Sequence, residues 1–334
     1  MKIAVAGCTG YIGSSLVNEL LSEGHHVLCI TRSSTQHGYL QNIRPQNVTY
    51  TTYDDLHSNL YSCQVLINVS GLAHRSPLPL EETMRALFQS NVKLTSQILH
   101  ASITANIKKY IHLSSVSIYG NTSAQEIIDE FSAPSPSSIY GCSKYISELL
   151  VHSLLCSTDV DYCILRAPMV YGPNCPGNFK ALFSFFRFSP INIWSNVVAQ
   201  RSFISIRHLV SVLSSISCPS FRPLRRTFII SDSTTVSVSQ LASSFYRLRN
   251  YPVLSIPFSP FILRFLFSLF GRTDSWEKIS NPFILDPSLF HRACDCSRSF
   301  SNADHIVALY LNRSHNHLLP SGTFLSHASP RNPP

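Results

Sequence analysis

Short apolar runs alternate with helical segments along the first part of the chain. The runs that favour β-strands cover residues 2–6, 26–30, 48–53, 65–70, 109–115 and 161–167. Between them, apolar residues recur at helical spacing, most clearly before Gly24 and in the stretches 80–105 and 140–155. Because the strand runs are almost continuously apolar, they predict a parallel sheet buried on both faces. The pattern therefore predicts an α/β fold with a doubly wound parallel sheet, whose ligand lies at the carboxyl ends of the strands.

After about residue 172 the regular alternation gives way to short, aromatic-rich segments with many prolines. This change predicts a smaller α+β lobe assembled from the later segments. We therefore expect a core domain over residues 1–172 and a substrate lobe over residues 173–311, with some segments returning to the core. Residues 312–334 are rich in His, Ser and Pro and are expected to form a disordered tail.

The most apolar later segment is VLSIPFSPFILRFLFSLFG, residues 253–271. Pro257, Pro260 and Arg264 interrupt it, and it falls short of the clean span of about 20 apolar residues that crosses a bilayer. It predicts a loop followed by a buried or surface-docked helix. Weak contact with a membrane surface stays open as an alternative.

Composition narrows the class of protein. The 334 residues are 44% hydrophobic and 13% charged, which is typical of a globular protein. The net charge of +8 comes from scattered basic residues, so we expect no nucleic-acid partner. The cysteines include the pair Cys294 and Cys296 but show no second pair at zinc spacing, so we expect no metal. Free thiols and the lack of a signal-peptide pattern predict a cytoplasmic protein.

The motif GCTGYIG at residues 7–13 joins the first predicted strand to the first predicted helix. Gly7 permits a tight turn, Gly10 allows a phosphate to approach the backbone, and Gly13 allows the helix to pack on the sheet. The helix N-terminus offers free N–H groups and a partial positive charge to a pyrophosphate. A purely structural corner is the alternative.

Tyr140 and Lys144 lie four residues apart on a predicted helix and therefore face the same way. A cation close to a phenol stabilises the phenolate, so Tyr140 could act as an acid or base well below its usual pKa of about 10. Ser115, at the end of a predicted strand, could hydrogen-bond a reacting hydroxyl or ketone.

These motifs, in this order, resemble the extended, sugar-nucleotide-modifying branch of the short-chain dehydrogenase/reductase superfamily. The glycine turn, the serine of LSSVSIYG and the YGCSK element carry the resemblance, which extends from residue 1 to about residue 290. It implies a Rossmann fold that binds NAD or NADP over residues 1–172, with Ser115, Tyr140 and Lys144 as catalytic residues.

The resemblance also implies a set of cofactor-binding residues. These are Gly7, Gly10, Tyr11, Ile12, Gly13, Arg32, Asp54, Ser70, Gly71, Asn91, Lys144 and Pro168. Arg32 departs from the family, which often carries an acid there for NAD. A basic residue can pair with a 2′-phosphate, so Arg32 slightly favours NADP and the choice between NAD and NADP stays open.

The reaction is narrowed by the two residues after Ser115. Dehydratases of this family carry an Asp-Glu pair there, whereas this chain has Val116 and Ser117. A valine cannot donate a proton, so dehydration is disfavoured and hydride chemistry remains.

Later motifs imply a nucleotide-sugar substrate. Asn178 in GNF and Arg201 in QRSFISIRHLV match segments that contact the sugar nucleotide, and the arginine suits a bidentate contact with a diphosphate. Arg207 and His208 replace the acidic residue expected nearby. The resemblance is closest to the bacterial enzymes that act on UDP-N-acetylhexosamines for surface polysaccharide.

The sequence thus predicts an NAD(P)-dependent epimerase or oxidoreductase that transfers hydride at C4 of a UDP-hexose or UDP-N-acetylhexosamine. An NAD(P)H-dependent keto-sugar reductase and a non-catalytic dinucleotide-binding protein are the alternatives. The helices that carry Asn91 and Tyr140 form a dimer contact in this family, which implies a homodimer.

Overall fold

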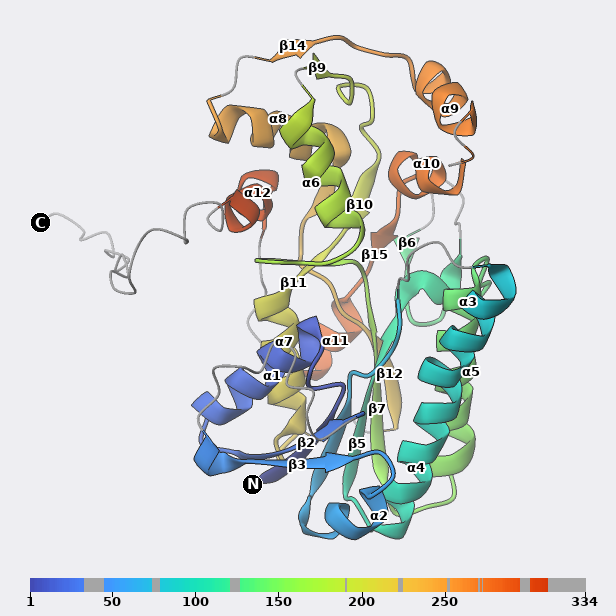
Figure 1. Cartoon of the computed structure of the whole chain (residues 1–334), viewed down its shortest axis with the longest axis vertical. Helices are drawn as coiled ribbons and strands as arrows, with labels where there is room; N and C mark the ends of the chain where they lie inside the picture. Colours follow the sequence, from blue (N-terminus) through green and yellow to red (C-terminus); the bar gives the residue numbers. More distant parts are fainter. Residues whose placement is uncertain are drawn as a thin grey trace, which may run out of the picture.

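A seven-stranded parallel sheet forms the centre of the molecule, with strand order β12-β7-β5-β4-β1-β2-β3 (Figure 1). The computed structural model describes residues 1–32, 45–73, 79–120, 127–189, 191–221, 225–250, 253–269, 271, 273–294 and 301–311, so the predicted tail over residues 312–334 lies outside the described residues. The strands are β1 (Lys2–Ala6), β2 (His26–Thr31), β3 (Val48–Thr52), β4 (Val65–Asn68), β5 (Lys109–Ser115), β7 (Asp161–Ala167) and β12 (Arg226–Ile229).

Helices cover both faces of this sheet, because its strands are apolar on both sides (Figure 1). One face packs against α1 (Tyr11–Ser22), α7 (Ile206–Ser217) and α11 (Ser288–Ala293). The other face packs against α2 (Leu56–Asn59), α4 (Leu94–Thr104) and α5 (Ile139–Leu155). The predicted doubly wound α/β fold is confirmed.

Two details differ from the pattern expected. The helix expected over residues 80–105 is divided into α3 (Leu80–Leu87), a π-helical turn (Phe88–Lys93) and α4. The strand β12 was not expected from the sequence. It pairs with β7 through Arg226↔Cys163 to Ile229↔Arg166, and so returns a late segment to the core sheet.

The order of the strands reverses between β1 and β4. From β1 the chain builds outward through β2 and β3 on one side, and through β4, β5, β7 and β12 on the other. The loops that leave β1 and β4 therefore diverge at the carboxyl edge of the sheet, which is where doubly wound folds bind their ligands. Gly7 follows β1 directly, and Ser70 lies two residues beyond β4.

A second, smaller group of elements packs around its own aromatic core. Figure 1 shows it at the end of the molecule away from β2 and β3. It contains α6 (Asn178–Phe188), α8 (Val238–Leu248), α9 (Pro260–Leu269), α10 (Thr273–Ser280) and α12 (Ala303–Leu311), with short strands that include β9 (Ile191–Asn192), β10 (Gln200–Ser202), β13 (Thr235–Ser237), β14 (Leu254–Ser255) and β15 (Ile284–Leu285).

The smaller lobe is therefore α+β, as expected. Across the described part of the chain, no helix combines the length and apolar character that crossing a bilayer requires.

Candidate active site

The glycine turn after β1 is closely packed. The backbone of Gly7 has φ +85°, and a Cβ added there would lie 2.7 Å from the Ser70 backbone nitrogen. A Cβ on Gly13 would lie 2.1 Å from the Gly7 carbonyl oxygen. Side chains are excluded from this corner, and no side chain caps the start of α1. The N–H groups at the start of α1 are thus left for an anion, which fits the predicted pyrophosphate site.

The end of β4 closes the other side of this turn. The Asn68 carboxamide oxygen accepts hydrogen bonds from the Ser70 backbone N–H (3.0 Å) and hydroxyl (2.5 Å), and its amide donates to the Tyr110 hydroxyl at 2.9 Å. Asn68 is fully buried. It therefore fixes the position of Ser70 beside Gly7.

Asn91 lies in the π-helical turn and is almost fully buried. Its side chain bonds the backbone of Leu72 twice, accepting from the N–H at 2.7 Å and donating to the carbonyl at 3.1 Å, and it also donates to Ser143 at 2.9 Å. A Cβ on Gly71 would lie 3.2 Å from Asn91 and 3.9 Å from the Lys144 ammonium. The structure thus brings Gly71, Asn91 and Lys144 together. π-turns are often found at functional sites.

Helix α5 begins at a capped position. The Ser138 side chain accepts a hydrogen bond from the Gly141 N–H at 3.1 Å, which satisfies one of the free N–H groups of the first turn. The first turns of α5 carry Tyr140 and Lys144, so the cap sets where both side chains start.

The Lys144 side chain extends from α5 to β5, where its ammonium donates to the Leu113 carbonyl at 2.6 Å. Only 4% of Lys144 is exposed, and this burial lowers its pKa from 10.5 to about 8, partly opposed by the charge of Glu148. A neighbouring histidine, His112, is also buried, and its pKa is held well below the usual value by burial and by the Lys144 charge.

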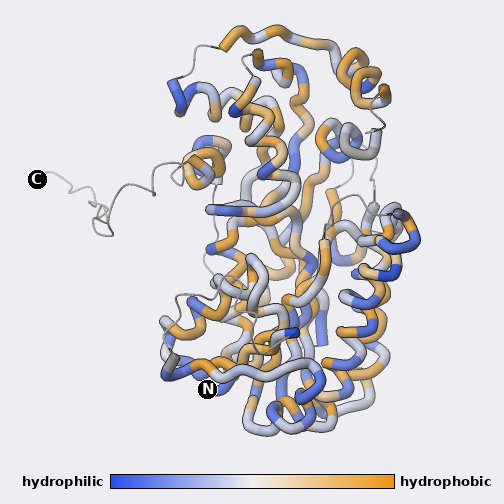
Figure 2. Tube along the Cα trace, in the orientation of Figure 1, coloured by the Kyte–Doolittle hydropathy of each residue, from blue (hydrophilic) through white to orange (hydrophobic). Residues whose placement is uncertain are grey.

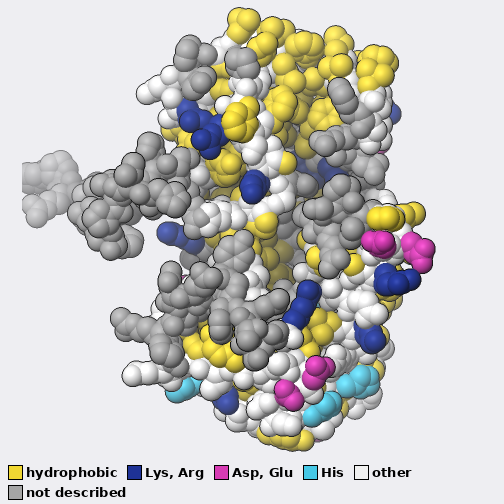
Figure 3. Space-filling view, viewed as in Figure 1, with side chains coloured by type: hydrophobic (Ala, Val, Ile, Leu, Met, Phe, Trp, Pro, Cys, Tyr) yellow, Lys and Arg dark blue, Asp and Glu magenta, His cyan; other side chains and the backbone are white. Residues whose placement is uncertain are grey.

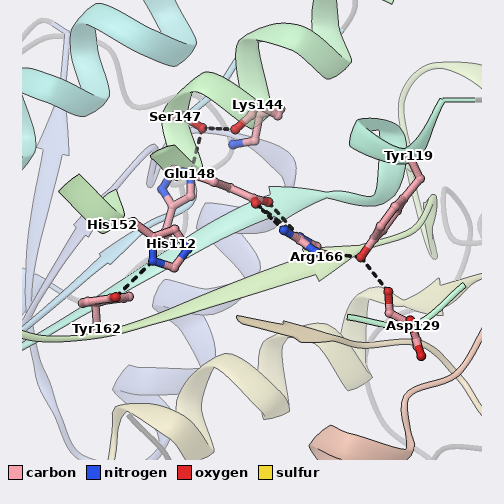
Figure 4. Close-up of polar contacts among 9 residues, drawn as sticks. All are labelled: His112, Tyr119, Asp129, Lys144, Ser147, Glu148, His152, Tyr162 and Arg166. Carbon is pink, nitrogen blue, oxygen red and sulfur yellow. Dashed lines mark hydrogen bonds and ion pairs between the residues drawn. The ribbon is translucent and has the colours of Figure 1, made fainter. Parts of the chain in front are cut away.

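One turn after Lys144, Glu148 forms a buried ion pair with Arg166 of β7 (Figure 4). The guanidinium donates to both carboxylate oxygens, with distances of 2.8 and 3.2 Å, and also to the Tyr119 hydroxyl at 2.7 Å. Two polar contacts, from Lys144 and Glu148, therefore hold α5 against the sheet. Removing one partner of such a pair leaves an uncompensated buried charge, which costs about 3 to 5 kcal/mol.

The Tyr140 phenol and the Ser115 hydroxyl lie close enough for the Ser115 side chain to lower the pKa of Tyr140. Burial raises the Tyr140 pKa above its usual value, and the nearby Ser115 hydroxyl opposes this rise only in part. The shift is opposite in direction to the one expected from Lys144, because burial of the phenol is its largest cause. A further positive charge beside the phenol would lower the pKa of Tyr140.

The two residues after Ser115 lie in a short 3-10 turn (Val116–Tyr119). Val116 is buried in an apolar cluster. The Ser117 backbone N–H donates to the Ser115 hydroxyl at 3.2 Å, and the two hydroxyls lie 3.1 Å apart. Neither residue supplies a carboxyl group, which agrees with the exclusion of dehydratase chemistry.

The outer cofactor residues lie along the same edge of the sheet but make fewer contacts. Arg32 follows β2 and is exposed, as is Asp54 beyond β3. The phenol of Tyr53, next to Asp54, instead lies near the Gly7 backbone and the Ser70 side chain, both of which lower its pKa. Burial raises its pKa to about 12. Tyr53 is therefore the side chain of this segment that reaches the turn.

Other members of the predicted cofactor set surround the turn. Tyr11 and Ile12 open α1 and pack against the core cluster below it, and Pro168 is buried directly after β7. A Cβ on Gly172 would lie 2.8 Å from the Tyr11 hydroxyl, so Tyr11 reaches the start of the smaller lobe.

The predicted substrate residues lie in the smaller lobe. Arg201 is in β10, donates to the Asn281 carbonyl at 2.6 Å and lies 5.2 Å from the ring centre of Phe283. Burial lowers its pKa to about 10. Among the residues that the structure describes, the Arg201 side chain contacts Asn281 and Phe283 and forms no hydrogen bond with Ser115, Tyr140 or Lys144. Asn178 is the first residue of α6, and its side chain lies outside the described positions.

Arg207 and His208 stand where the family has an acidic residue, and in the structure His208 pairs with the carboxylate of Asp232. His208 is buried and its Nδ1 lies 2.8 Å from a carboxylate oxygen of Asp232. The other carboxylate oxygen accepts from the hydroxyls of Tyr171 at 2.6 Å and Ser301 at 2.8 Å. A carboxylate is therefore present here, but it comes from a later segment.

Several residues that shape the site were not among those expected to bind cofactor or substrate. Asn68, Tyr53 and Ser143 each touch an expected residue. Ser143 could have been found by its spacing, because it lies three residues after Tyr140 and beside Lys144 on one helix. The contact of Tyr53 depends on the tertiary structure alone.

Comparisons with known proteins show the family to which this chain is similar. The model of the NAD dependent epimerase/dehydratase family matches residues 3–216. A UDP-glucose 4-epimerase from Vibrio cholerae is 23% identical over 296 residues, which cover 86% of this chain and 88% of that protein. Protein CapI from Staphylococcus aureus is 27% identical over 229 residues, covering 64% of this chain and 68% of that protein.

A solved structure shows a similar fold. UDP-glucuronic acid 4-epimerase from Bacillus cereus, in complex with NAD, has a TM-score of 0.75 and 20% sequence identity, covering 94% of this chain and all of that one.

Because the charge of Lys144 is buried, a substitution that removes this charge should stabilise the folded protein. Between pH 8 and 10.5 the unfolded chain binds more protons at this position than the folded chain, so this residue makes stability rise with pH across that window. Below pH 8 the folded protein carries the full cost of the buried charge. We expect Lys144→Met to raise the free energy of unfolding at pH 7 by about 1 to 3 kcal/mol, because the lost bond to Leu113 offsets part of the gain.

Urea denaturation of the nucleotide-free protein at pH 7 and pH 10 checks this expectation. The advantage of the variant should shrink towards pH 10. Lys108→Met, at an exposed lysine, is the matched control and should show no such trend. If Lys144→Met does not raise the free energy of unfolding at pH 7, or raises it equally at pH 7 and pH 10, the lowered pKa of the buried Lys144 is contradicted.

Proposed function

Because this chain belongs to the NAD-dependent epimerase/dehydratase family, we propose that it interconverts the C4 epimers of a UDP-hexose or UDP-N-acetylhexosamine. The observation that carries the proposal is the group at the carboxyl edge of the sheet. Tyr140 lies close to Ser115, one helical turn before the buried Lys144, and Lys144 in turn lies beside Gly71 and Asn91.

The residues present fit a dinucleotide. The closed corner at Gly7 and Gly13 leaves the start of α1 for the pyrophosphate, and Gly71, Asn91 and Lys144 would hold the nicotinamide ribose. When bound, the cofactor supplies a hydride acceptor that can also return the hydride.

The protein's own residues handle the proton and the orientation of the sugar. Tyr140 takes the proton of the C4 hydroxyl onto its phenolate oxygen and gives it back when the hydroxyl re-forms. The Ser115 hydroxyl holds the reacting oxygen and is itself oriented by Ser117. Arg201 would bind the diphosphate, and Asn178 would contact the sugar nucleotide. The similarity to the UDP-glucose 4-epimerase of V. cholerae supports this substrate class.

Replacement of Tyr140 tests the proposal. We expect Tyr140→Phe to lower kcat by about 10²- to 10⁴-fold, because the reacting hydroxyl then has no acid or base. The assay incubates UDP-glucose, UDP-GlcNAc or UDP-GalNAc with NAD or NADP and follows the epimers by NMR. Tyr145→Phe, five residues along the same helix, is the matched control and should keep its activity.

The same assay with the wild-type protein distinguishes an epimerase from a dehydrogenase, a reductase and a non-catalytic protein. Interconversion of epimers without net cofactor reduction supports the proposal. Net reduction of the cofactor would indicate a dehydrogenase, net oxidation of added NADPH with a keto-sugar a reductase, and cofactor binding without turnover a non-catalytic protein.

The choice of cofactor is expected to depend on Arg32. Its exposed guanidinium can form charge-assisted hydrogen bonds with a 2′-phosphate, which slightly favours NADP, although the B. cereus neighbour was solved with NAD. If so, Arg32→Ala should raise the Kd for NADP by about tenfold and leave that for NAD unchanged. Titration calorimetry measures both, and equal changes would contradict the role.

A homodimer is proposed through α5. This helix presents a shallow surface hollow lined by Ile146, Leu149, Leu150, His152, Ser153 and Cys156. Leu149 is 47% exposed. Leu149→Glu should shift the protein to a monomer in sedimentation velocity, whereas Leu248→Glu, at a similarly exposed leucine, should not. A wild-type monomer would contradict the proposal.

We place the protein in the cytoplasm. Every cysteine that the structure describes is a free thiol, which suits a reducing compartment. Cell fractionation tests this placement, and recovery outside the cytoplasm and its membrane face would refute it.

A further inference from the structure

Helix α9 carries apolar side chains on two opposite faces. Leu263 and Phe267 face the lobe, where Leu263 is fully buried and Phe267 lies 5.6 Å, ring to ring, from Trp276. The other apolar residues recur at helical spacing on the outer face, and they are Phe261, Ile262, Phe265, Leu266 and Leu269. Their exposed fractions run from 38% to 82%. A helix that needed only to pack on the lobe would be polar on this outer side.

The apolar surface continues beyond α9. Leu254 and Ile256, in and after β14, are 65% and 36% exposed. The end of α6 adds Phe188, at 80% exposed. Phe185 contacts Trp194 (5.3 Å), which contacts Phe267 of α9 (6.4 Å), so α6 and α9 are joined through one tryptophan. We call these exposed residues of α9, β14 and the end of α6 the apical surface.

The apical surface lies at one end of the molecule. Figure 1 places α9, β9 and β14 at the end opposite to β2 and β3, and Figure 2 colours the β14–α9 segment mostly hydrophobic. Figure 3 shows hydrophobic side chains gathered along this end of the molecule. Several separate elements thus present exposed apolar side chains at the end of the molecule away from β2 and β3.

The charges of this surface have one sign. The segments 178–188 and 253–269 contain no Asp or Glu, whereas Arg187 and Arg264 are exposed. The Arg187 guanidinium lies 5.8 Å from the ring centre of Phe188, so a cation and an aromatic ring share one position. Two copies of this surface facing each other would bring like charges together. An anionic lipid surface offers the opposite charge for the arginines and an apolar layer for the phenylalanines.

We propose that the apical surface docks the protein on an anionic membrane, with Phe188, Phe261 and Phe265 inserted at the boundary between headgroups and acyl chains. Arg187 and Arg264 lie at the level of the lipid phosphates. The lobe is then fixed to the membrane, and the core sheet extends into the water. This inference goes beyond the proposed reaction and does not depend on it.

Co-sedimentation with lipid vesicles tests the docking. The full chain is mixed with vesicles of phosphatidylcholine alone or with added phosphatidylglycerol, and the bound fraction gives a partition coefficient. We expect binding to the anionic vesicles, about tenfold weaker for Arg187→Gln/Arg264→Gln, and lost in Phe261→Ser/Phe265→Ser. Phe131→Ser is the matched control, because Phe131 is 85% exposed but lies outside the apical surface.

Circular dichroism checks that each variant is folded. If the double phenylalanine variant is not folded, Phe188→Ser and the arginine variant provide the test. Absence of wild-type binding, or equal binding by the apical variants, overturns the proposal. A change in sedimentation coefficient without lipid, seen only in the apical variants, also overturns it, because the surface would then join copies of the chain. The readout is binding, so its failure leaves the epimerase proposal standing.

Discussion

The buried ammonium of Lys144, bonded to the Leu113 carbonyl at 2.6 Å, fixes the position of helix α5 on the sheet. Burying the ammonium charge costs free energy of folding, and the lowered pKa of Lys144 reflects this cost. The Glu148–Arg166 pair, one turn further along the helix, holds the same two elements together through a second buried contact. Together they set the position of Tyr140 against Ser115. The buried charge of Lys144 lowers the stability of the fold, but it places a cation beside Gly71 and Asn91, where we propose that the nicotinamide ribose binds.

Much of the core could be predicted from the sequence, because continuous apolar strands and helical spacing leave few alternatives. The six strands of the central sheet up to residue 167 were predicted within one or two residues, whereas the short strand over Ile127–Ile128 was not, and the motifs around Gly7, Ser115 and Tyr140 fall at the expected edge of the sheet. β12 was missed because it is short and begins with Arg226 and Thr227, so that only Phe228 and Ile229 are apolar, and only its pairing with β7 makes it a strand of the core.

The rest of the site depends on tertiary contacts. No local pattern shows that residues 88–93 form a π-turn, or that the Asp232 carboxylate meets His208 across 24 positions of the chain. The position of the Tyr53 phenol near Gly7 likewise depends on the tertiary structure. The expected direction of the Tyr140 pKa shift was opposite to the one found, because spacing on a helix shows that Lys144 is near but not that the Tyr140 phenol is buried.

The most direct test of hydride transfer follows the hydrogen on C4 itself. A UDP-sugar carrying deuterium at C4 is converted by the wild-type protein in ordinary water, and the product epimer is analysed by mass spectrometry and NMR. Tyr140 exchanges only the hydroxyl proton, so the account predicts that deuterium stays on C4 of the product. Replacement of the deuterium by hydrogen from water would contradict it, because the C4 hydrogen would then have left as a proton.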